Sequence, residues 1–223
     1  MSLAVKLIVS VLLGYCFGVF KTGHFLGKLY NEDLSTKGSG NTGMTNTMRV
    51  LGKKVGLIAF LGDTLKAIIP ILITFFAFGK GTTHVTLFIM ITGLGAILGD
   101  MFPFYLNFNG GKGVSSTSGV ILSLMFVTGD WKFTVLGLAI FFTTMFVTKY
   151  VSVASMVLMT MFFLEMVIWG QLGFVYSLKG SKDNIWVYLI TLIIVILIFV
   201  RHKANIKRLL NGTENKIGRK KEA

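Results

Sequence analysis

A glycine-rich segment at residues 107–113, NFNGGKG, carries residue types that can bind phosphate. Glycines let backbone amides turn toward an anion, and a lysine among them adds a positive point charge. The glycines are Gly110, Gly111 and Gly113, and the lysine is Lys112. A helix is expected to follow, and its N-terminal amides would also favour an anion. The segment is not a Walker motif, because the upstream glycine is missing. The alternative is a flexible membrane turn with one lysine that reaches the interface.

A second segment, residues 37–56, has the same character. Arg49 offers a planar guanidinium that can bind phosphate or carboxylate through two hydrogen bonds. The small and short polar residues near it are Ser39, Gly40, Asn41, Thr45 and Asn46. The alternative is a capping cluster, because Thr45 or Asn46 is suited to begin the next helix. Together the two segments predict a site for two phosphates, or for one phosphate and an acyl group.

Charged residues inside apolar stretches form a third group of candidates. Such residues cost about 2.5–3.5 kcal/mol each on insertion scales, so they are candidates for functional sites. Asp63 and Lys66 are three residues apart on one expected helix and can therefore pair, either in a site or as a structural ion pair. Asp100 precedes a Phe-Pro sequence at the end of another stretch, and Glu165 has no obvious partner.

The composition places these segments in a membrane protein. Of the 223 residues, 53% are hydrophobic and 14% are charged, against roughly 45–50% and about 25% in soluble domains. This excludes a disordered chain, a collagen-like chain and a disulfide scaffold, and the one cysteine, Cys16, cannot form an internal disulfide. The net charge of +13 fits basic membrane-flanking loops and an anionic ligand better than a nucleic-acid partner.

Apolar stretches of about 20 residues predict an all-α fold, a polytopic membrane helix bundle with about seven transmembrane helices. The expected spans are residues 3–20, 55–78, 85–106, 114–129, 132–148, 151–175 and 184–200. The stretch at 114–129 is short and rich in serine and threonine, so six spans are the alternative. The first span lacks the features of a cleaved signal peptide. No repeat or composition shift divides the chain, and we expect one domain over residues 1–223.

Lysine and arginine counts predict the orientation, because cytoplasmic loops carry the excess of positive charge. With the N-terminus outside, sixteen of the 22 basic residues fall on the cytoplasmic side and five outside, and Lys66 lies within a span. The cytoplasmic parts are residues 21–54, 107–113, the break near 149 and the tail 201–223. The tail is basic and amphipathic and is expected to lie along the inner surface. Both glycine-rich segments therefore face the cytoplasm.

Four blocks of sequence, in order along the chain, resemble the bacterial acyl-phosphate:glycerol-3-phosphate acyltransferase family. The first is GSGNTGMTN at residues 38–46, with Arg49 and residues 52–53, and the second is DTLK at residues 63–66, with residues 69–70. The third is Phe102-Pro103 with GGKGV at residues 110–114, and the fourth is His202 with residues 205–208 and 214–217. All four fall on the predicted inner face, and they extend over nearly the whole chain.

The resemblance implies a bacterial inner-membrane enzyme with its active site at the cytoplasmic face. It would move a fatty acyl group from acyl phosphate to the 1-hydroxyl of sn-glycerol 3-phosphate, as the first step of phospholipid synthesis. The products would be 1-acyl-glycerol 3-phosphate and phosphate. Its partners would be these two substrates and membrane lipid, with no metal and no cofactor.

The resemblance also assigns roles to residues. Those with catalytic or substrate contacts would be Ser39, Arg49, Lys112, His202 and Asn205. To the phosphate site we add Gly40, Asn41, Thr45, Asn46, Lys66, Gly110, Gly111 and Gly113, and a structural role is expected for Asp63 and Glu214. None of the motifs offers a serine–histidine–acid triad, so positioning and charge balance would supply the rate. The proton acceptor would be His202, which could equally be a tail-anchoring residue, or a phosphate oxygen of a substrate.

Departures from the family pattern bear on the pocket. Asp100 stands where the family usually has histidine, and a carboxylate there would repel phosphate unless protonated or paired. Pairing with Lys112 or Arg49 would offset that charge. The other departures are GVFK at residues 18–21 for Gly-Ser-Ile-Pro, Met44 for alanine and Asn109 for lysine. They leave open a divergent or inactive paralogue. The buried charges leave open a transporter or a lipid or anion binder.

Overall fold

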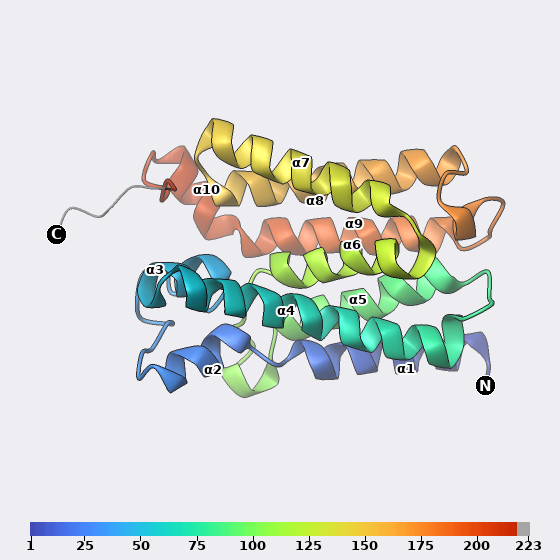
Figure 1. Ribbon diagram of the computed structural model, residues 1–223, viewed down its shortest axis with the longest axis horizontal. Coiled ribbons are helices and arrows are strands. Elements are labelled where there is room, and N and C mark those ends of the chain that lie inside the picture. Colours follow the sequence, from blue (N-terminus) through green and yellow to red (C-terminus); the bar gives the residue numbers. More distant parts are fainter. Residues whose placement is uncertain (218–223) are drawn as a thin grey trace.

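The computed structural model describes residues 1–217, and long helices run side by side through it (Figure 1). The long helices are α1 (Leu3–Gly18), α4 (Lys53–Thr74), α5 (Val85–Met101), α6 (Val114–Thr128), α7 (Trp131–Thr148), α8 (Val151–Gln171) and α9 (Asn184–Arg201). Shorter helices are α2 (Thr22–Leu29), α3 (Met44–Leu51) and α10 (Lys203–Leu210). A π-helical turn, η1 (Phe75–Gly79), extends α4, and the short 3₁₀ turns are η2 (Phe104–Leu106) and η3 (Tyr176–Leu178). Residues 1–217 contain no strand, so the predicted all-α class is confirmed.

Within residues 1–217, six helical segments are long and apolar enough to cross a membrane. They are Leu3–Leu29, Lys53–Gly79, Val85–Leu106, Trp131–Thr148, Val151–Gln171 and Asn184–Arg201. The 15-residue helix α6 is apolar but shorter, and it coincides with the stretch for which the sequence left six spans as the alternative. The count of seven spans and the orientation stay predictions. The span expected at 151–175 ends earlier, at Gln171, because the chain turns through Gly173 with φ +74°.

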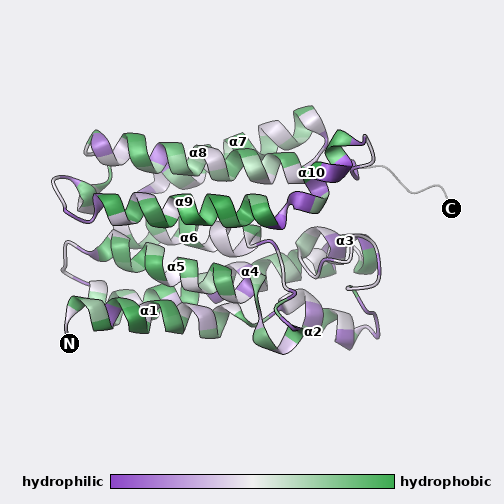
Figure 2. Cartoon of the chain, turned by 180° about the vertical axis from the view of Figure 1, so that it is seen from behind, coloured by the Kyte–Doolittle hydropathy of each residue, from purple (hydrophilic) through white to green (hydrophobic). Residues whose placement is uncertain are grey.

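Polar structure gathers at one end of the bundle. Figure 1 places α2, α3 and α10 at that end, and the N-terminus at the other. Figure 2 shows hydrophilic residues concentrated there and apolar residues along the helices. The two glycine-rich segments and the start of the basic tail therefore share one end, as the span count predicts. Residues 218–223 of the tail lie outside the described residues.

The helix α4 shows how the bundle reverses the pattern of a soluble protein. Its Leu57, Leu61 and Leu65 are each about half exposed, whereas Asp63 and Lys66 are almost fully buried. Because lipid tails solvate leucine as well as a protein core does, the apolar face can point outward and the polar face can pair inside. The buried charges of Asp63 and Lys66 therefore need partners inside the bundle, and Lys66 finds one in Asp100 on α5.

Helices α1 and α5 pack closely through glycines at four-residue spacing. The pairs are Gly14 with Gly18 on α1, and Gly95 with Gly99 on α5. A Cβ atom on Gly95 would lie 2.2 Å from the carbonyl oxygen of Val11. Small residues at this spacing let two membrane helices approach backbone to backbone. The end of α1 is thereby fixed against the end of α5.

Candidate functional site

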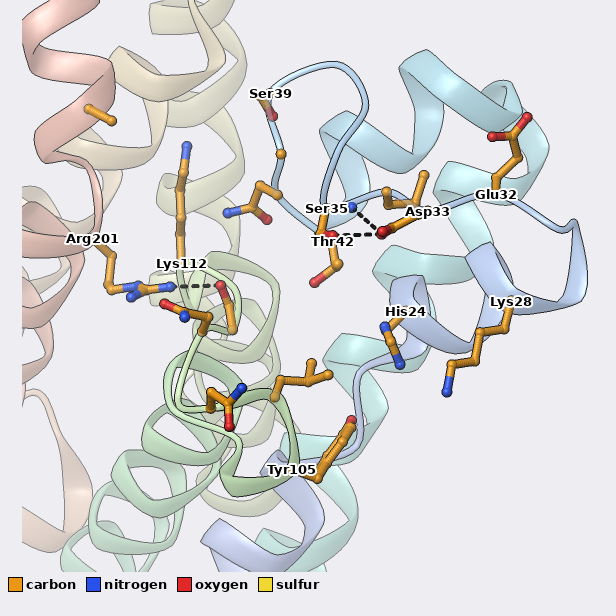
Figure 3. Close-up of a pocket in the computed structure, with 18 of the residues that line it drawn as sticks. His24, Lys28, Glu32, Asp33, Ser35, Ser39, Thr42, Tyr105, Lys112 and Arg201 are labelled. Carbon is orange, nitrogen blue, oxygen red and sulfur yellow. Dashed lines mark hydrogen bonds between the residues drawn. The ribbon is translucent and has the colours of Figure 1, made fainter.

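A cavity of about 1010 Å³ opens at the polar end of the bundle. Its walls come from α2 and the loop after it, from the segment after α5, and from the α9–α10 junction. In Figure 3, Lys112 and Arg201 lie on one side, His24 and Lys28 lie on the other, and Ser39 lies in the loop between them. The predicted site residues that line it are Ser39, Gly40, Asn41, Gly110, Lys112 and Asn205. Segments far apart in sequence therefore meet as expected.

A hydrogen-bonded chain leads from the cavity wall to the tail. The Lys112 ammonium donates to Asn205 Oδ1 at 2.5 Å, and Asn205 Nδ2 donates to Glu214 Oε1 at 2.7 Å. Glu214 also accepts from Ser152 Oγ at 3.1 Å and from Arg208 Nε at 2.7 Å. Burial alone would raise the pKa of Glu214, but these donors lower it below its usual value. The carboxylate is therefore an ionised anchor that ties the tail to α8 and α10, a structural position.

Replacing Glu214 with alanine is expected to lower the free energy of unfolding by about 1–3 kcal/mol, because its buried donors lose their acceptor. Glu32→Ala is the control, since the side chains of the Glu32–Lys37 pair are 32% and 54% exposed and such a pair should be worth about 0–1 kcal/mol. The thermal midpoints of both variants in detergent measure the difference. Equal midpoints would contradict the anchoring role.

Basic side chains surround Lys112. Burial lowers the pKa of Lys112 to about 8, the nearby cations Arg208, Arg49 and Arg201 act in the same direction, and Glu214 opposes them. Arg49 therefore lies within electrostatic range of Lys112, on the same end of the bundle, although its own exposed side chain does not form part of the cavity wall. The arrangement suits an anionic ligand, because added negative charge would relieve this repulsion.

Arg201 lines the cavity, although the sequence motifs did not point to it. Its Nη2 donates to the Gly110 carbonyl at 2.7 Å and its Nε donates to the Gly111 carbonyl at 3.0 Å. The guanidinium also lies over the Phe102 ring, 5.4 Å from the centroid. A cation directly after the last apolar span was the available signal. The cavity residues that were not predicted also include His24, Lys28, Tyr105 and Arg208.

The glycine segment corrects the prediction of an open anion nest. The amide of Gly110 donates to the Met101 carbonyl at 3.0 Å, and the amide of Gly111 donates to the Asp100 carbonyl at 2.8 Å. The amide of Gly113 donates to Asp100 Oδ2 at 3.0 Å. These three amides are satisfied within the chain, because the loop folds back on the end of α5. In this loop, it is Lys112 that presents a charge to the cavity.

Asp100 does not pair with Lys112 or Arg49, which corrects the second expectation. Its Oδ1 accepts from Lys21 at 2.6 Å and from Lys66 at 2.5 Å. The reason lies in the α1–α5 contact, which brings the residues after α1 next to the end of α5. The pocket charge is therefore not cancelled by this carboxylate.

The predicted pair of Asp63 and Lys66 is present, with Nζ and Oδ1 3.1 Å apart. Lys66 also donates to the Phe20 carbonyl at 2.8 Å. It is 4% exposed and does not line the cavity, so the structure does not place it as a phosphate contact. Its charge is balanced inside the bundle, which removes one argument for a permeation path.

Asn46 and Thr45 also lie away from the cavity wall. The Asn46 amide donates to the carbonyls of Leu34 and Lys37, and its Oδ1 accepts from the Ser39 amide at 2.7 Å. It braces the loop that carries Ser39 toward the cavity. Thr45 is half-buried on α3. Of these two predicted ligands, Asn46 has its polar groups committed to the loop itself.

His202 is 2% exposed, at the end of α9. Burial and the nearby Lys112 lower its pKa to about 4, so the ring is neutral near pH 7. Its Nδ1 lies 2.8 Å from the Ile198 carbonyl oxygen and donates to it. This contact stays within the last turn of α9, so both alternatives for His202, proton acceptor and tail anchor, stay predictions.

The chain matches a known protein family over most of its length. The model described as glycerol-3-phosphate acyltransferase matches residues 8–212. The chain belongs to the glycerol-3-phosphate acyltransferase family. A glycerol-3-phosphate acyltransferase from Macrococcus caseolyticus is 37% identical over 97% of this chain and 100% of its own length. Another from Clostridioides difficile is 35% identical over 96% of this chain and 97% of its own.

Solved structures of this family have the same fold. The crystal structure of PlsY, an integral membrane glycerol 3-phosphate acyltransferase, in its glycerol 3-phosphate form superposes with a TM-score of 0.77 at 33% identity. The match covers 95% of this chain and 96% of that one. The lysophosphatidic acid form gives a TM-score of 0.76 at 32% identity. The chain is thus an integral membrane member of this acyltransferase family.

Proposed function

We propose that this protein transfers a fatty acyl group from acyl phosphate to the 1-hydroxyl of sn-glycerol 3-phosphate. The hydroxyl oxygen would bond to the acyl carbonyl carbon, the bond from that carbon to the phosphate oxygen would break, and the products would be 1-acyl-glycerol 3-phosphate and phosphate. The observation that carries this proposal is the cavity in which Lys112, Arg201 and Arg208 meet the Ser39 loop. Such a cavity suits two phosphate-bearing substrates.

The residues fit a reaction that needs little covalent help. An acyl phosphate is a mixed anhydride with a good leaving group, so positioning the hydroxyl and the carbonyl would supply much of the rate. Lys112, Arg208 and Arg201 would balance the charge of two phosphates in a site of reduced dielectric. Asn205, which holds Lys112, would orient that charge.

The proton of the attacking hydroxyl would pass to a phosphate oxygen of a substrate. The buried position of His202 and its contact with the Ile198 carbonyl support this choice over His202 as the base. We place the reaction at the cytoplasmic face of a bacterial inner membrane, where the positive-inside rule puts the basic end of the bundle.

Activity is expected to fall as pH rises through about 8. Lys112 attracts phosphate only when protonated, and its pKa is lowered to about 8, so the attraction is present below that pH and lost above it. The pH profile of kcat/KM measures this limb. Lys112→Arg is the matched variant. Its kcat/KM should not decline above about pH 8, because arginine stays charged to about pH 12. A wild-type profile flat to about pH 10, the ordinary lysine range, would contradict the role.

A donor assay tests the function. Purified protein in lipid nanodiscs is given glycerol 3-phosphate with palmitoyl phosphate, palmitoyl-CoA or palmitoyl-acyl-carrier protein in parallel. The expected result is 1-palmitoyl-glycerol 3-phosphate from palmitoyl phosphate alone. Product from palmitoyl-CoA alone, or no product from folded protein, would reject the proposal.

A further inference from the structure

We propose that Asp100 is a positioning residue that fixes the glycine loop 110–113 and thereby aims Lys112 into the cavity. Lys21 and Lys66 hold the Asp100 carboxylate in place. The inference rests on the proposed function, and it explains how the charge of that site is set in position. Asp100 does not line the cavity, so it would act through the loop and not by touching substrate.

The hydrogen bonds of Asp100 reach both neighbours of Lys112. Its main-chain oxygen accepts from the Gly111 amide at 2.8 Å, and its Oδ2 accepts from the Gly113 amide at 3.0 Å. Lys112 lies between these two attachment points. Its backbone is therefore held from both sides by one residue of α5.

The second carboxylate oxygen of Asp100 faces two cations. Oδ1 accepts from Lys21 Nζ at 2.6 Å and from Lys66 Nζ at 2.5 Å. The Asp63 carboxylate lies beside the same two cations, with Oδ1 3.1 Å from Lys66 Nζ and Oδ2 3.8 Å from Lys21 Nζ. These four side chains, which we call the buried charge cluster, are each at most 4% exposed. Two ammonium groups and two carboxylates make the cluster neutral overall.

Stability alone is a poor explanation for the buried charge cluster. Desolvation of buried ions offsets most of their attraction, and apolar replacements often fold as well. What an apolar cluster would lack is a directed acceptor for the Gly113 amide. The role of the cluster is therefore to hold Asp100 Oδ2 where it accepts from the Gly113 amide.

The loop is shaped to close onto this cluster. A Cβ atom on Gly111 would lie 2.5 Å from Asp100 Oδ2 and 2.6 Å from Lys21 Nζ. Gly113 has φ +81°, which other residues rarely adopt. Arg201 donates to the carbonyls of Gly110 and Gly111. The loop is thus hydrogen-bonded both to Asp100, which Lys21 and Lys66 hold, and to Arg201. The Lys112 side chain reaches Asn205.

The test compares Asp100→Asn with Asp183→Asn. Asp183 Oδ2 is also paired at 2.6 Å, with His84, in the loops at the other end of the bundle, and no proposed site residue contacts it. Asparagine keeps the shape of residue 100 but removes the charge that Lys21 and Lys66 neutralise. Hydrogen exchange of the peptide covering residues 107–116 reports on the loop without any substrate. We expect it to become about tenfold faster in Asp100→Asn, as for local opening, and unchanged in Asp183→Asn.

Two activity readouts separate positioning from general stability. A displaced loop should lower kcat/KM by about 10-fold to 10²-fold, the cost of a misplacement near 1 Å. It should also move the alkaline limb of the pH profile upward, because Lys112 would gain solvent. The groups facing Lys112 are Glu214, Arg208, Arg49, Arg201 and His202, and neither variant changes them. A loss of stability alone would leave the limb in place.

Gly111→Ala gives a second route, because its Cβ separates the loop from Asp100 while every charge is kept. It should reproduce the faster exchange and the shifted limb, and it decides the test where Asp100→Asn does not fold. Unchanged loop exchange in folded Asp100→Asn, or equal changes in Asp183→Asn, would overturn the proposal. If wild-type protein makes no product while Asp100→Asn alone loosens the loop, the positioning stands and the proposed function fails.

Discussion

Lys112→Ala is expected to lower kcat/KM for acyl transfer by about 10²–10³-fold, the usual cost of removing one preorganised charge donor. The folded fraction should stay unchanged, because Lys112 ends in the cavity and its partner Asn205 keeps Glu214. Arg49→Ala should act in the same direction, since its charge acts on the same pocket. Steady-state assays with palmitoyl phosphate and glycerol 3-phosphate measure both variants.

Lys203→Ala is the control for lost positive charge at this end of the bundle. Lys203 is exposed on α10 and does not line the cavity, so its removal should change kcat/KM by less than about twofold, as for a screened surface charge. If Lys112→Ala behaves like Lys203→Ala, the phosphate role of the cavity is wrong.

Gly95→Leu is expected to prevent folding, which is the largest structural effect that we predict. Even the Cβ of Gly95→Ala would lie 2.2 Å from the Val11 carbonyl oxygen, and overpacking of this kind costs about 1–3 kcal/mol or more. Thermal unfolding and the monodisperse fraction in detergent measure the loss. The α1–α5 contact also places Lys21 beside Asp100, so activity should fall together with stability.

The smaller substitution Gly95→Ala is measured beside Gly95→Leu, and Gly137→Ala on α7 is its matched control. There the nearest atom to a new Cβ is Leu158 Cδ1 at 3.2 Å, the end of a side chain that can move. Alanine favours helix over glycine by about 1 kcal/mol, so this variant should be neutral or stabilising. Equal losses in Gly95→Ala and Gly137→Ala would show that the α1–α5 contact has no special role.

The buried charge cluster changes how the departures from the family pattern are interpreted. Asp100 and Lys21, which depart at separate places in the sequence, touch at 2.6 Å. The carboxylate that would repel phosphate is neutralised away from the cavity by Lys21 and Lys66. The pocket therefore keeps its positive charge, and this supports an active enzyme over an inactive paralogue.

The sequence by itself determined the long apolar helices and several of the residues that gather at the polar end. Each apolar stretch carries the chain across the bundle, so the order of the stretches places the Ser39 loop, the Lys112 loop and the tail that carries Asn205 at one end. Helical length and apolar content are local properties, and they can be read without knowing any contact. The family motifs added the identity of the substrates as an expectation.

Only the tertiary structure decided the partners. Lys21 is 79 residues from Asp100, and their pairing depends on the approach of α1 to α5, which single-residue chemistry does not reveal. The glycine amides were expected to point at a ligand, but glycine permits many directions, and the loop turned them toward Asp100 and Met101. The residue type of Asn46 likewise did not show whether its side chain would contact a ligand or the loop, and in the structure it bonds to the loop. Hydrogen-bond direction is set by the surrounding packing, so residue type predicted where the site lies, and three-dimensional contacts decided which groups face it.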